Sequence, residues 1–250
     1  MLNIKDYYNN AYRKFTPDYI QSSNISKINA YLNENAQTLI NFFTEYTEQF
    51  NLELGLSQKS CLELGCGIGS LSYFLNDKFY EFKAIDNSEL AISTAKEISN
   101  IKEKNIDFCV ASVTSAIDLG VKYDFIIDSH LFHCLTLASD RRAYIEFVKR
   151  HLKLGGQFLL ETMAFQPKMQ IPVGYQMDEN CILFKEIDSK VIPVRSIQKS
   201  IDIETELNDL GLRINYLYFH NELSFHVFDD YHNYPEEYCP KTIRLSCLAE

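Results

Sequence analysis

The sequence predicts an α/β fold in which a mostly parallel sheet carries helices on both faces. From Cys61 onward, short apolar runs alternate with amphipathic stretches whose apolar residues recur at helical spacing. This alternation is typical of parallel strands joined by crossover helices. The first apolar run leads directly into three alternate glycines, Gly65, Gly67 and Gly69, which indicate a tight turn between a strand and a helix. We therefore expect the sheet and this turn to organise the molecule.

The alternation gives expected bounds for each element. Helices are expected after the glycine turn, after Asn87 or Ser88 as the N-cap, from Asp140 to Leu152, and around residues 203–210. Asp140 is the expected cap of the third helix, and Gly155-Gly156 is expected to stop it. Strands are expected at residues 60–64, 81–85, 106–110, 123–128, 157–163, 213–220 and 242–248.

Two segments depart from this pattern and predict the domain organisation. Residues 1–57 look helical, with a break at residues 16–18, and form an expected N-terminal helical cap. Residues 58–250 form the core, and residues 164–197, interrupted by three prolines and a glycine, are an expected insertion on the substrate side. Aromatic residues near the N-terminus, Tyr19 among them, are either core residues or a lid over a pocket.

The composition excludes several classes of protein. The chain has 250 residues and a formal net charge of -10, and its 24 Lys and Arg residues are scattered, so a nucleic-acid partner is not expected. We see neither a signal peptide nor an apolar run of about 20 residues, so a cytoplasmic chain outside the membrane is expected. The seven cysteines include no C-x-x-C pair and are expected to be free thiols. The sequence leaves the oligomeric state open.

Asp86 is the second element of the candidate site. It ends the second expected strand, about 20 residues beyond Gly65, where the carboxyl ends of parallel strands meet. A carboxylate there can accept hydrogen bonds from ribose hydroxyls while the glycine turn meets the rest of a nucleoside. Nicotinamide and S-adenosylmethionine enzymes share this arrangement, so Asp86 alone does not choose between them.

Three features separate these cofactors. The glycine pattern is acidic-x-G-x-G-x-G, from Glu63 to Gly69, whereas a dinucleotide fingerprint would place its third glycine at Ser70. The stretch YDFIIDSHLFHCL at residues 123–135 is an apolar strand that runs into two histidines, and LKLGG at residues 152–156 precedes another strand. With these motifs, the sequence resembles the class I S-adenosylmethionine-dependent methyltransferases. The resemblance implies a Rossmann-like seven-stranded sheet of order 3-2-1-4-5-7-6, with the last strand antiparallel.

The resemblance also implies roles for individual residues, with S-adenosyl-L-methionine as the cofactor. Asp128 would lie near the methionine amino group or the sulfonium. If the aromatic residues near the N-terminus form a lid, Tyr19 would also be a cofactor-binding residue. Many relatives carry Asp where Ser112 stands, which leaves the adenine amino group to the backbone or to the hydroxyl. The remaining cofactor-binding positions are Glu63, Gly65, Cys66, Gly67 and Gly69 for the methionine and nucleoside side, Asp86 and Asn87 for the ribose, and Ser112 and Val113 for the adenine.

The expected reaction is transfer of a methyl group to a small-molecule acceptor by in-line displacement. Because the departing thioether is neutral, no acid is required, and positioning can supply about 7–11 kcal/mol of the barrier reduction in favourable cases. His130 and His133 are the candidate general bases for a hydroxyl or protonated amine, and the alternative is that either is a structural residue that orients a backbone carbonyl. They lack a fourth ligand for a metal site with Cys134.

Three other functions stay open. A methyltransferase of protein side chains would need an open acidic groove, whereas a small-molecule enzyme would have a closed, aromatic-lined pocket. A non-catalytic S-adenosylmethionine-binding protein would place nothing opposite the methyl group. A nicotinamide oxidoreductase would need a hydride site such as Tyr-x-x-x-Lys, which the sequence does not contain.

Overall fold

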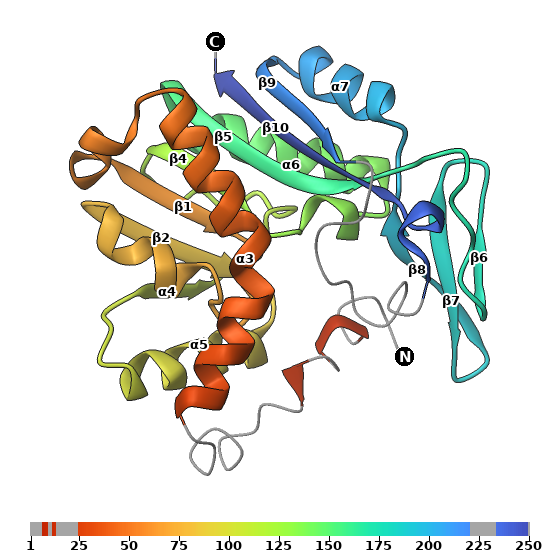
Figure 1. The fold of residues 1–250 in the computed structure, drawn as a ribbon, viewed down its shortest axis with the longest axis horizontal. Coiled ribbons are helices and arrows are strands. Elements are labelled where there is room, and N and C mark those ends of the chain that lie inside the picture. Colours follow the sequence, from red (N-terminus) through yellow and green to blue (C-terminus); the bar gives the residue numbers. More distant parts are fainter. Residues whose placement is uncertain (1–6, 10–11, 14–24, 221–233, 250) are drawn as a thin grey trace.

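The computed structural model describes residues 7–9, 12–13, 25–220 and 234–249. Within these ranges a twisted seven-stranded sheet carries helices on both faces, and a smaller three-stranded sheet lies beside one end of it (Figure 1). The strands of the large sheet are β1 (Ser60–Leu64), β2 (Glu81–Asp86), β3 (Asp107–Val110), β4 (Tyr123–Asp128), β5 (Leu152–Ala164), β9 (Leu212–His220) and β10 (Lys241–Ala249).

The order of these strands is β3-β2-β1-β4-β5-β10-β9, which confirms the predicted order 3-2-1-4-5-7-6. Strands β1 to β5 pair in parallel, and β10 pairs antiparallel with both β5 and β9. Leu64 at the end of β1 lies opposite Ile85 on one side and Asp128 on the other. The carboxyl ends of β1, β2 and β4 therefore meet at one edge of the sheet, where ligands bind in open α/β folds.

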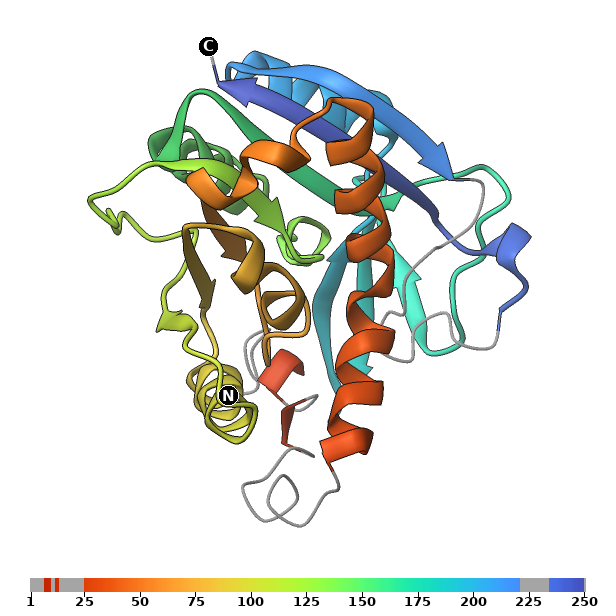
Figure 2. The same cartoon turned by 60° about the vertical axis from the view of Figure 1, so that its left-hand side comes forward.

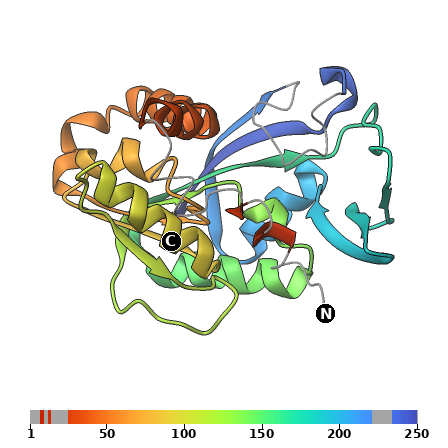
Figure 3. The same ribbon diagram turned by 90° about the horizontal axis from the view of Figure 1, so that it is seen from below.

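Helices cover both faces of the sheet, as Figures 2 and 3 show. One face packs against α3 (Ile25–Gln49), α4 (Ser72–Leu75) and α5 (Glu89–Ile101). The other packs against α6 (Ala138–His151) and α7 (Ser200–Asp209). Short 3-10 helices lie at Glu53–Gln58, Asn76–Lys78, Phe132–Cys134 and Glu236–Tyr238. In α3, the buried residues Leu39, Phe42, Phe43 and Tyr46 recur at helical spacing, and Phe50, just beyond the end of the helix, is exposed.

Several predicted boundaries are wrong, and α6 is the clearest case. This helix begins at Ala138 with Leu137 at the N-cap, so Asp140 lies inside the first turn, where its negative charge suits the helix dipole. It ends at His151, and β5 starts at once, so Gly155 and Gly156 lie within the strand and do not stop the helix. After the glycine turn, α4 is only four residues long and continues as a 3-10 turn.

The predicted insertion has regular structure that the sequence did not indicate. It forms an antiparallel sheet of β6 (Tyr175–Met177), β7 (Ile182–Ile187) and β8 (Lys190–Ser196). Leu183, Val194 and Ile197 pack with Met163 of β5 in a small apolar core, which attaches this sheet to the large one. Residues 7–9 are helical and lie between α3 and the small sheet (Figure 1). The predicted break at residues 16–18 lies outside the described residues.

Candidate active site

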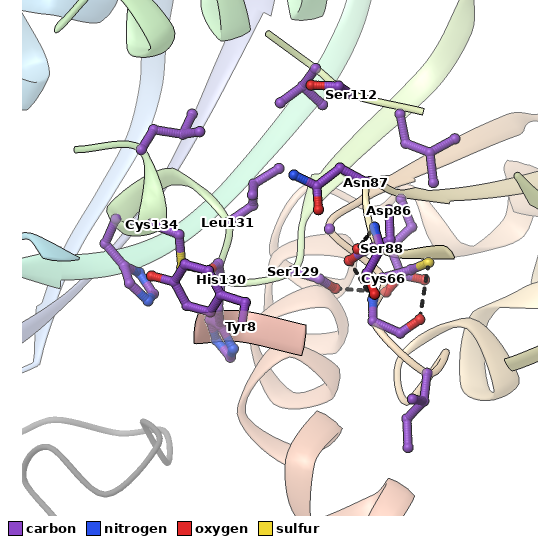
Figure 4. Close-up of a pocket in the computed structure, with 18 of the residues that line it drawn as sticks. Tyr8, Cys66, Asp86, Asn87, Ser88, Ser112, Ser129, His130, Leu131 and Cys134 are labelled. Carbon is purple, nitrogen blue, oxygen red and sulfur yellow. Dashed lines mark hydrogen bonds between the residues drawn. The ribbon is translucent and has the colours of Figure 1, made fainter. Parts of the chain in front are cut away.

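A cavity of about 670 Å³ opens at the carboxyl ends of β1, β2 and β4. Its walls come from the glycine turn, from the loops after β2, β3 and β4, from α3, from β8 of the small sheet and from Tyr8 and Tyr12. Figure 4 shows two ends: Cys66, Asp86 and Asn87 lie together, and Tyr8, His130 and Cys134 lie together away from them. We refer to the first group as the Asp86 end and to the second as the His130 end.

The glycine turn presents bare backbone to the Asp86 end. The backbone N–H groups of Gly65 and Cys66 both donate to the Ile85 carbonyl, at 2.9 and 3.0 Å, which fixes the turn against β2. Gly65 and Gly67 have positive φ values of 70° and 53°, and a Cβ on either would lie 2.8 Å from a side-chain atom of Leu131 or Tyr12. Glycine is therefore required at both positions by conformation and by space.

Asp86 is held directly against this turn. Its Oδ2 accepts a hydrogen bond from the Gly67 N–H at 3.0 Å, and its Oδ1 accepts one from the Ser88 N–H at 2.8 Å. A carboxylate has about four acceptor sites in all. The structure thus places the turn and the carboxylate side by side at an open cavity, as the sequence predicted. Asn87, Ser112 and Val113 line the same cavity.

Glu63 lies in the wall of this cavity and is completely buried. Its two oxygens accept hydrogen bonds from the Ser72 hydroxyl at 2.5 Å and the Ser129 hydroxyl at 2.7 Å. Burial raises the pKa of Glu63 to about 7, the charge of Asp86 adds to the rise, and the two hydroxyls oppose it. Near neutral pH, Glu63 therefore exchanges between its neutral and charged forms.

Asp128 and Gly69 are predicted site residues that do not line the cavity. The carboxylate of Asp128 is fully buried and accepts hydrogen bonds from the N–H of Leu131 at 2.8 Å and the hydroxyl of Tyr144 at 2.7 Å. Burial raises its pKa to about 6. These bonds hold the loop after β4, which carries both histidines. A Cβ on Gly69 would lie 2.7 Å from the ring of Phe108, so Gly69 lets the turn pack closely.

His130 lines the cavity and is coupled to a buried carboxylate. Its Nε2 lies 2.8 Å from Oε1 of Glu161, a fully buried residue of β5. The Nε of Arg244 donates to the other oxygen of Glu161 at 2.6 Å, and the Thr38 hydroxyl donates to Oε1 at 2.8 Å. Burial alone would raise the pKa of Glu161, but His130 and Arg244 hold it at about 2. Because Glu161 is ionised, Nε2 of His130 carries the proton, and the neutral ring keeps its lone pair on Nδ1.

His133 has a different environment. It is 2% exposed, its Nδ1 lies 3.3 Å from the Thr162 hydroxyl, and its ring centroid lies 6.3 Å from that of His130. Burial lowers the pKa of His133 well below the usual value, and the charges of Arg195 and His130 lower it further. His133 therefore stays neutral and contributes a polar, uncharged wall.

The structure adds functional candidates that the sequence analysis missed. Glu161 and Arg244 face each other in the register of β5 and β10, and Arg195 of β8 lines the cavity at the His130 end. A signal existed for the first two, since each is the single charge in a mostly apolar run, FLLETMA at residues 158–164 and IRLSCLA at residues 243–249. Tyr19 lies outside the described residues. Tyr8 and Tyr12, from the same aromatic segment, do line the cavity.

Comparisons with known proteins agree with this geometry. Residues 62–158 match a family model described as a methyltransferase domain. An uncharacterized methyltransferase of Staphylococcus carnosus is 24% identical over 207 residues, which is 82% of this chain and 90% of the relative. Among solved structures, an S-adenosylmethionine-dependent methyltransferase from Clostridium acetobutylicum aligns over 98% of this chain and all of its own, with a TM-score of 0.61 and 17% identity.

A second solved structure is a complex with the methyl donor. The glycopeptide N-methyltransferase MtfA with S-adenosyl-L-methionine covers 82% of this chain and 93% of its own, with a TM-score of 0.55 and 16% identity. Fold, cavity and family model together define an S-adenosylmethionine-dependent enzyme. Residues 62–158 match a methyltransferase domain, and the chain has the fold of S-adenosylmethionine-dependent methyltransferases.

The residues present fit the cofactor of this family. S-adenosylmethionine carries a sulfonium and an ammonium group, and the Asp86 end offers two acidic side chains, Glu63 and Asp86. Gly65 and Gly67 beside them contribute no side chain of their own to this end, and Tyr12 of the N-terminal segment lies against Gly67. No helix among the described residues is both long and apolar enough to cross a bilayer.

Proposed function

We propose that this methyltransferase acts on a small molecule. The observation that carries this proposal is the cavity, whose volume of about 670 Å³ lies within the range of about 300–1,000 Å³ for small-molecule sites. Aromatic side chains of the N-terminal segment and a strand of the small sheet enclose it, whereas an extended protein substrate would need an open groove. The net charge of -10 supports an acceptor other than a nucleic acid.

The cofactor is assigned to the Asp86 end. Asp86, with Asn87 beside it, binds the ribose hydroxyls, and the backbone from Gly65 to Gly67 meets the methionine and nucleoside. Ser112 and Val113 flank the adenine, and Glu63 faces the positive charge of the cofactor. Asp128 and Gly69 act indirectly, because Asp128 holds the loop after β4 and Gly69 allows the turn to pack.

S-adenosylmethionine supplies an activated methyl group on a sulfonium, and the protein contributes mainly position. Rigid placement of two reactants can contribute about 7–11 kcal/mol in favourable cases. Tyr8, Tyr12 and β8 cover the cavity and exclude water from the acceptor. No acidic residue is required opposite the methyl group, because the product thioether leaves without charge.

His130 is the proposed general base for an acceptor that must lose a proton. Glu161 positions the ring and fixes the proton on Nε2, so that Nδ1 accepts the proton of the acceptor. The ion pair with Arg244 adds to the effect of His130 and favours the ionised form of Glu161. His133 is the weaker candidate, because its burial beside Arg195 disfavours the charged form. The similar glycopeptide N-methyltransferase supports nitrogen as one possible acceptor atom.

The test is methyl transfer from labelled S-adenosylmethionine to a metabolite extract and, separately, to the protein fraction of the same cells. We expect labelled product in the small-molecule fraction and none in the protein fraction, with heat-denatured enzyme as the control. Label in protein would replace this proposal by the protein-methyltransferase alternative. Cofactor binding without label in either fraction would favour the non-catalytic alternative.

A further inference from the structure

The His130 end of the cavity contains a permanent positive charge. Arg195 lies on β8 of the insertion, lines the cavity and is only 1% exposed. Its guanidinium does not lose its proton in proteins. Among the described residues that line the cavity, Arg195 is the single Lys or Arg. The small sheet therefore brings one fixed cation to a site whose other walls come from the large sheet and from helices.

The contacts of Arg195 place it among the residues that would face the acceptor. Its Nη1 donates to the Val194 carbonyl at 2.9 Å and to the Tyr8 hydroxyl, and lies 4.0 Å from the sulfur of Cys134. Its guanidinium carbon lies 5.2 Å from the centre of the Tyr8 ring. Tyr8 and Cys134 lie with His130, away from Asp86 (Figure 4). Arg195 thus belongs to the end of the cavity where the proposed base is found.

The field of Arg195 extends to the neighbouring titratable groups. Its charge lowers the pKa of His133, in addition to the effect of burial, and it opposes the rise that burial causes in the pKa of Tyr8. Both effects have the sign expected of a nearby cation. A protonated acceptor group close to Arg195 is therefore disfavoured, and an anionic group there is favoured.

The cavity as a whole is polarised in the same sense. Glu63 and Asp86 supply negative charge at the Asp86 end, which suits a cationic methyl donor, and Arg195 supplies positive charge at the opposite end. Glu34 and Asp140 also line the cavity, but Glu34 is exposed and Asp140 is half-buried, so water screens their charges. An acceptor with an anionic group distant from the methylated atom would match this distribution.

We propose that the methyl acceptor carries a carboxylate and that Arg195 binds it. A guanidinium presents its N–H groups as a planar fork, which matches the two oxygens of a carboxylate. A carboxylate on Arg195 would orient the acceptor with respect to His130. This inference rests on the proposed small-molecule function, and it assigns a role in specificity to the insertion.

The first experiment fractionates the metabolite extract on an anion exchanger at neutral pH and offers each fraction to the enzyme with labelled S-adenosylmethionine. We expect labelled product from the retained fraction, lost after carbodiimide and methylamine convert carboxylates to amides and unaffected by phosphatase. Product that forms only from the unretained fraction and survives conversion of carboxylates to amides would overturn the carboxylate inference and leave the proposed function intact. Loss on phosphatase treatment alone would overturn it in favour of a phosphate. Absence of product from every fraction would contradict the proposed function itself.

The second experiment compares variants on the active fraction. Arg195→Met is expected to lower kcat/KM by about 10²- to 10³-fold, mainly through KM, because a buried charge partner is removed. Arg195→Lys keeps the charge, loses the fork and should lie between this variant and the wild type. Lys190→Met removes an exposed cation from the same strand and is the matched control.

Binding of S-adenosylhomocysteine by each variant reports whether the Asp86 end is intact. Unchanged kcat/KM in a folded Arg195→Met or Arg195→Lys variant would overturn the inference. Should Arg195→Met fail to fold, Arg195→Lys decides the question. Equal loss of kcat/KM and of S-adenosylhomocysteine binding would also count against it, because that result indicates a structural role.

Discussion

Three buried carboxyl groups near the cavity have the same chemistry but different pKa values. The pKa is about 7 for Glu63, about 6 for Asp128 and about 2 for Glu161. Burial raises all three, and the partners account for the difference. Glu63 accepts hydrogen bonds from hydroxyls only, whereas Glu161 bonds to Arg244 and His130. Glu63 is therefore the carboxyl that can respond to a charged ligand at neutral pH.

Asp86→Ala is expected to weaken S-adenosylhomocysteine binding at least about tenfold, since the variant loses ribose hydrogen bonds to a charged acceptor. It also loses the bonds from the Gly67 and Ser88 N–H groups, which orient the turn. Calorimetric titration measures the affinity, and Asp107→Ala, an exposed carboxylate at the start of β3, is the control. Equal affinities in two folded variants would contradict the placement of the ribose at Asp86.

From the raised pKa of Glu63 we expect the affinity for the cofactor to depend on pH. Its pKa of about 7 means that the side chain is mostly neutral at pH 6 and mostly charged at pH 8. A charged carboxylate attracts the cationic cofactor, so the affinity for S-adenosylmethionine should rise as the pH rises through 7 and level off above it. Glu63→Gln should lose this part of the dependence. Comparing the two proteins removes the titration of the cofactor itself, and parallel curves would refute the assignment.

Glu161→Gln is expected to lower kcat/KM by about 10- to 100-fold, as changes to orienting partners commonly do. The loss should appear mainly in kcat, because Glu161 orients the His130 ring and does not contact the cofactor. Thr38→Val is the matched control, because it removes one hydrogen bond to Glu161 and leaves the charge. A lower rate with an equal loss of S-adenosylhomocysteine binding would indicate that Glu161 has a structural role only.

At the scale of elements, the sequence predicted those strands whose ends are marked by polar residues or glycines. β1 and β4 have the predicted bounds, because each is a short apolar run between polar or glycine residues. The strands of the insertion were not predicted, and the reasons are physical. β6 has only three residues, and β8 contains Pro193, which lacks an N–H group and is tolerated because β8 is an edge strand.

The residues of the candidate site also divide into those that could be placed from sequence and those that could not. Gly67 and Asp86 could be placed together from sequence because both follow parallel strands that end at one edge of a sheet. The contact between Glu161 and Arg244 could not be predicted from sequence. It depends on the register of the antiparallel pair β5 and β10, whose second strand is near the end of the chain. The position of Arg195 depends on how the insertion packs, and the sequence carries no periodic signal for that packing.

Ser88→Ala tests the element that supports Asp86. The Ser88 hydroxyl caps α5 by accepting a hydrogen bond from the Ala91 N–H at 3.1 Å, and it donates to the Asn9 side chain at 2.6 Å. Loss of a cap costs about 1 kcal/mol, which corresponds to about 2–4 °C in Tm for a chain of this size. Thermal unfolding measures the change, with Ser139→Ala on exposed surface as the control. An unchanged Tm would show that the cap contributes no net stability.

At the scale of the whole molecule, three separate segments meet at one cavity. The N-terminal segment supplies Tyr8 and Tyr12, the large sheet supplies the glycine turn and Asp86, and the insertion supplies Arg195. A ligand that touches two or more of these segments binds the native protein and not the unfolded chain. Its binding free energy therefore stabilises the assembled cavity as a unit.

S-adenosylhomocysteine should accordingly raise the Tm of the full chain. At a concentration 100 times its Kd, the added stability is about 2.7 kcal/mol, which corresponds to about 5–10 °C for a protein of this size. NAD at the same concentration should cause no shift, because the first turn has Ser70 where a dinucleotide site has its third glycine. Asp86→Ala should lose most of the shift, since weaker binding leaves less free energy to add. Stabilisation by NAD with none by S-adenosylhomocysteine would place a different cofactor at the glycine turn.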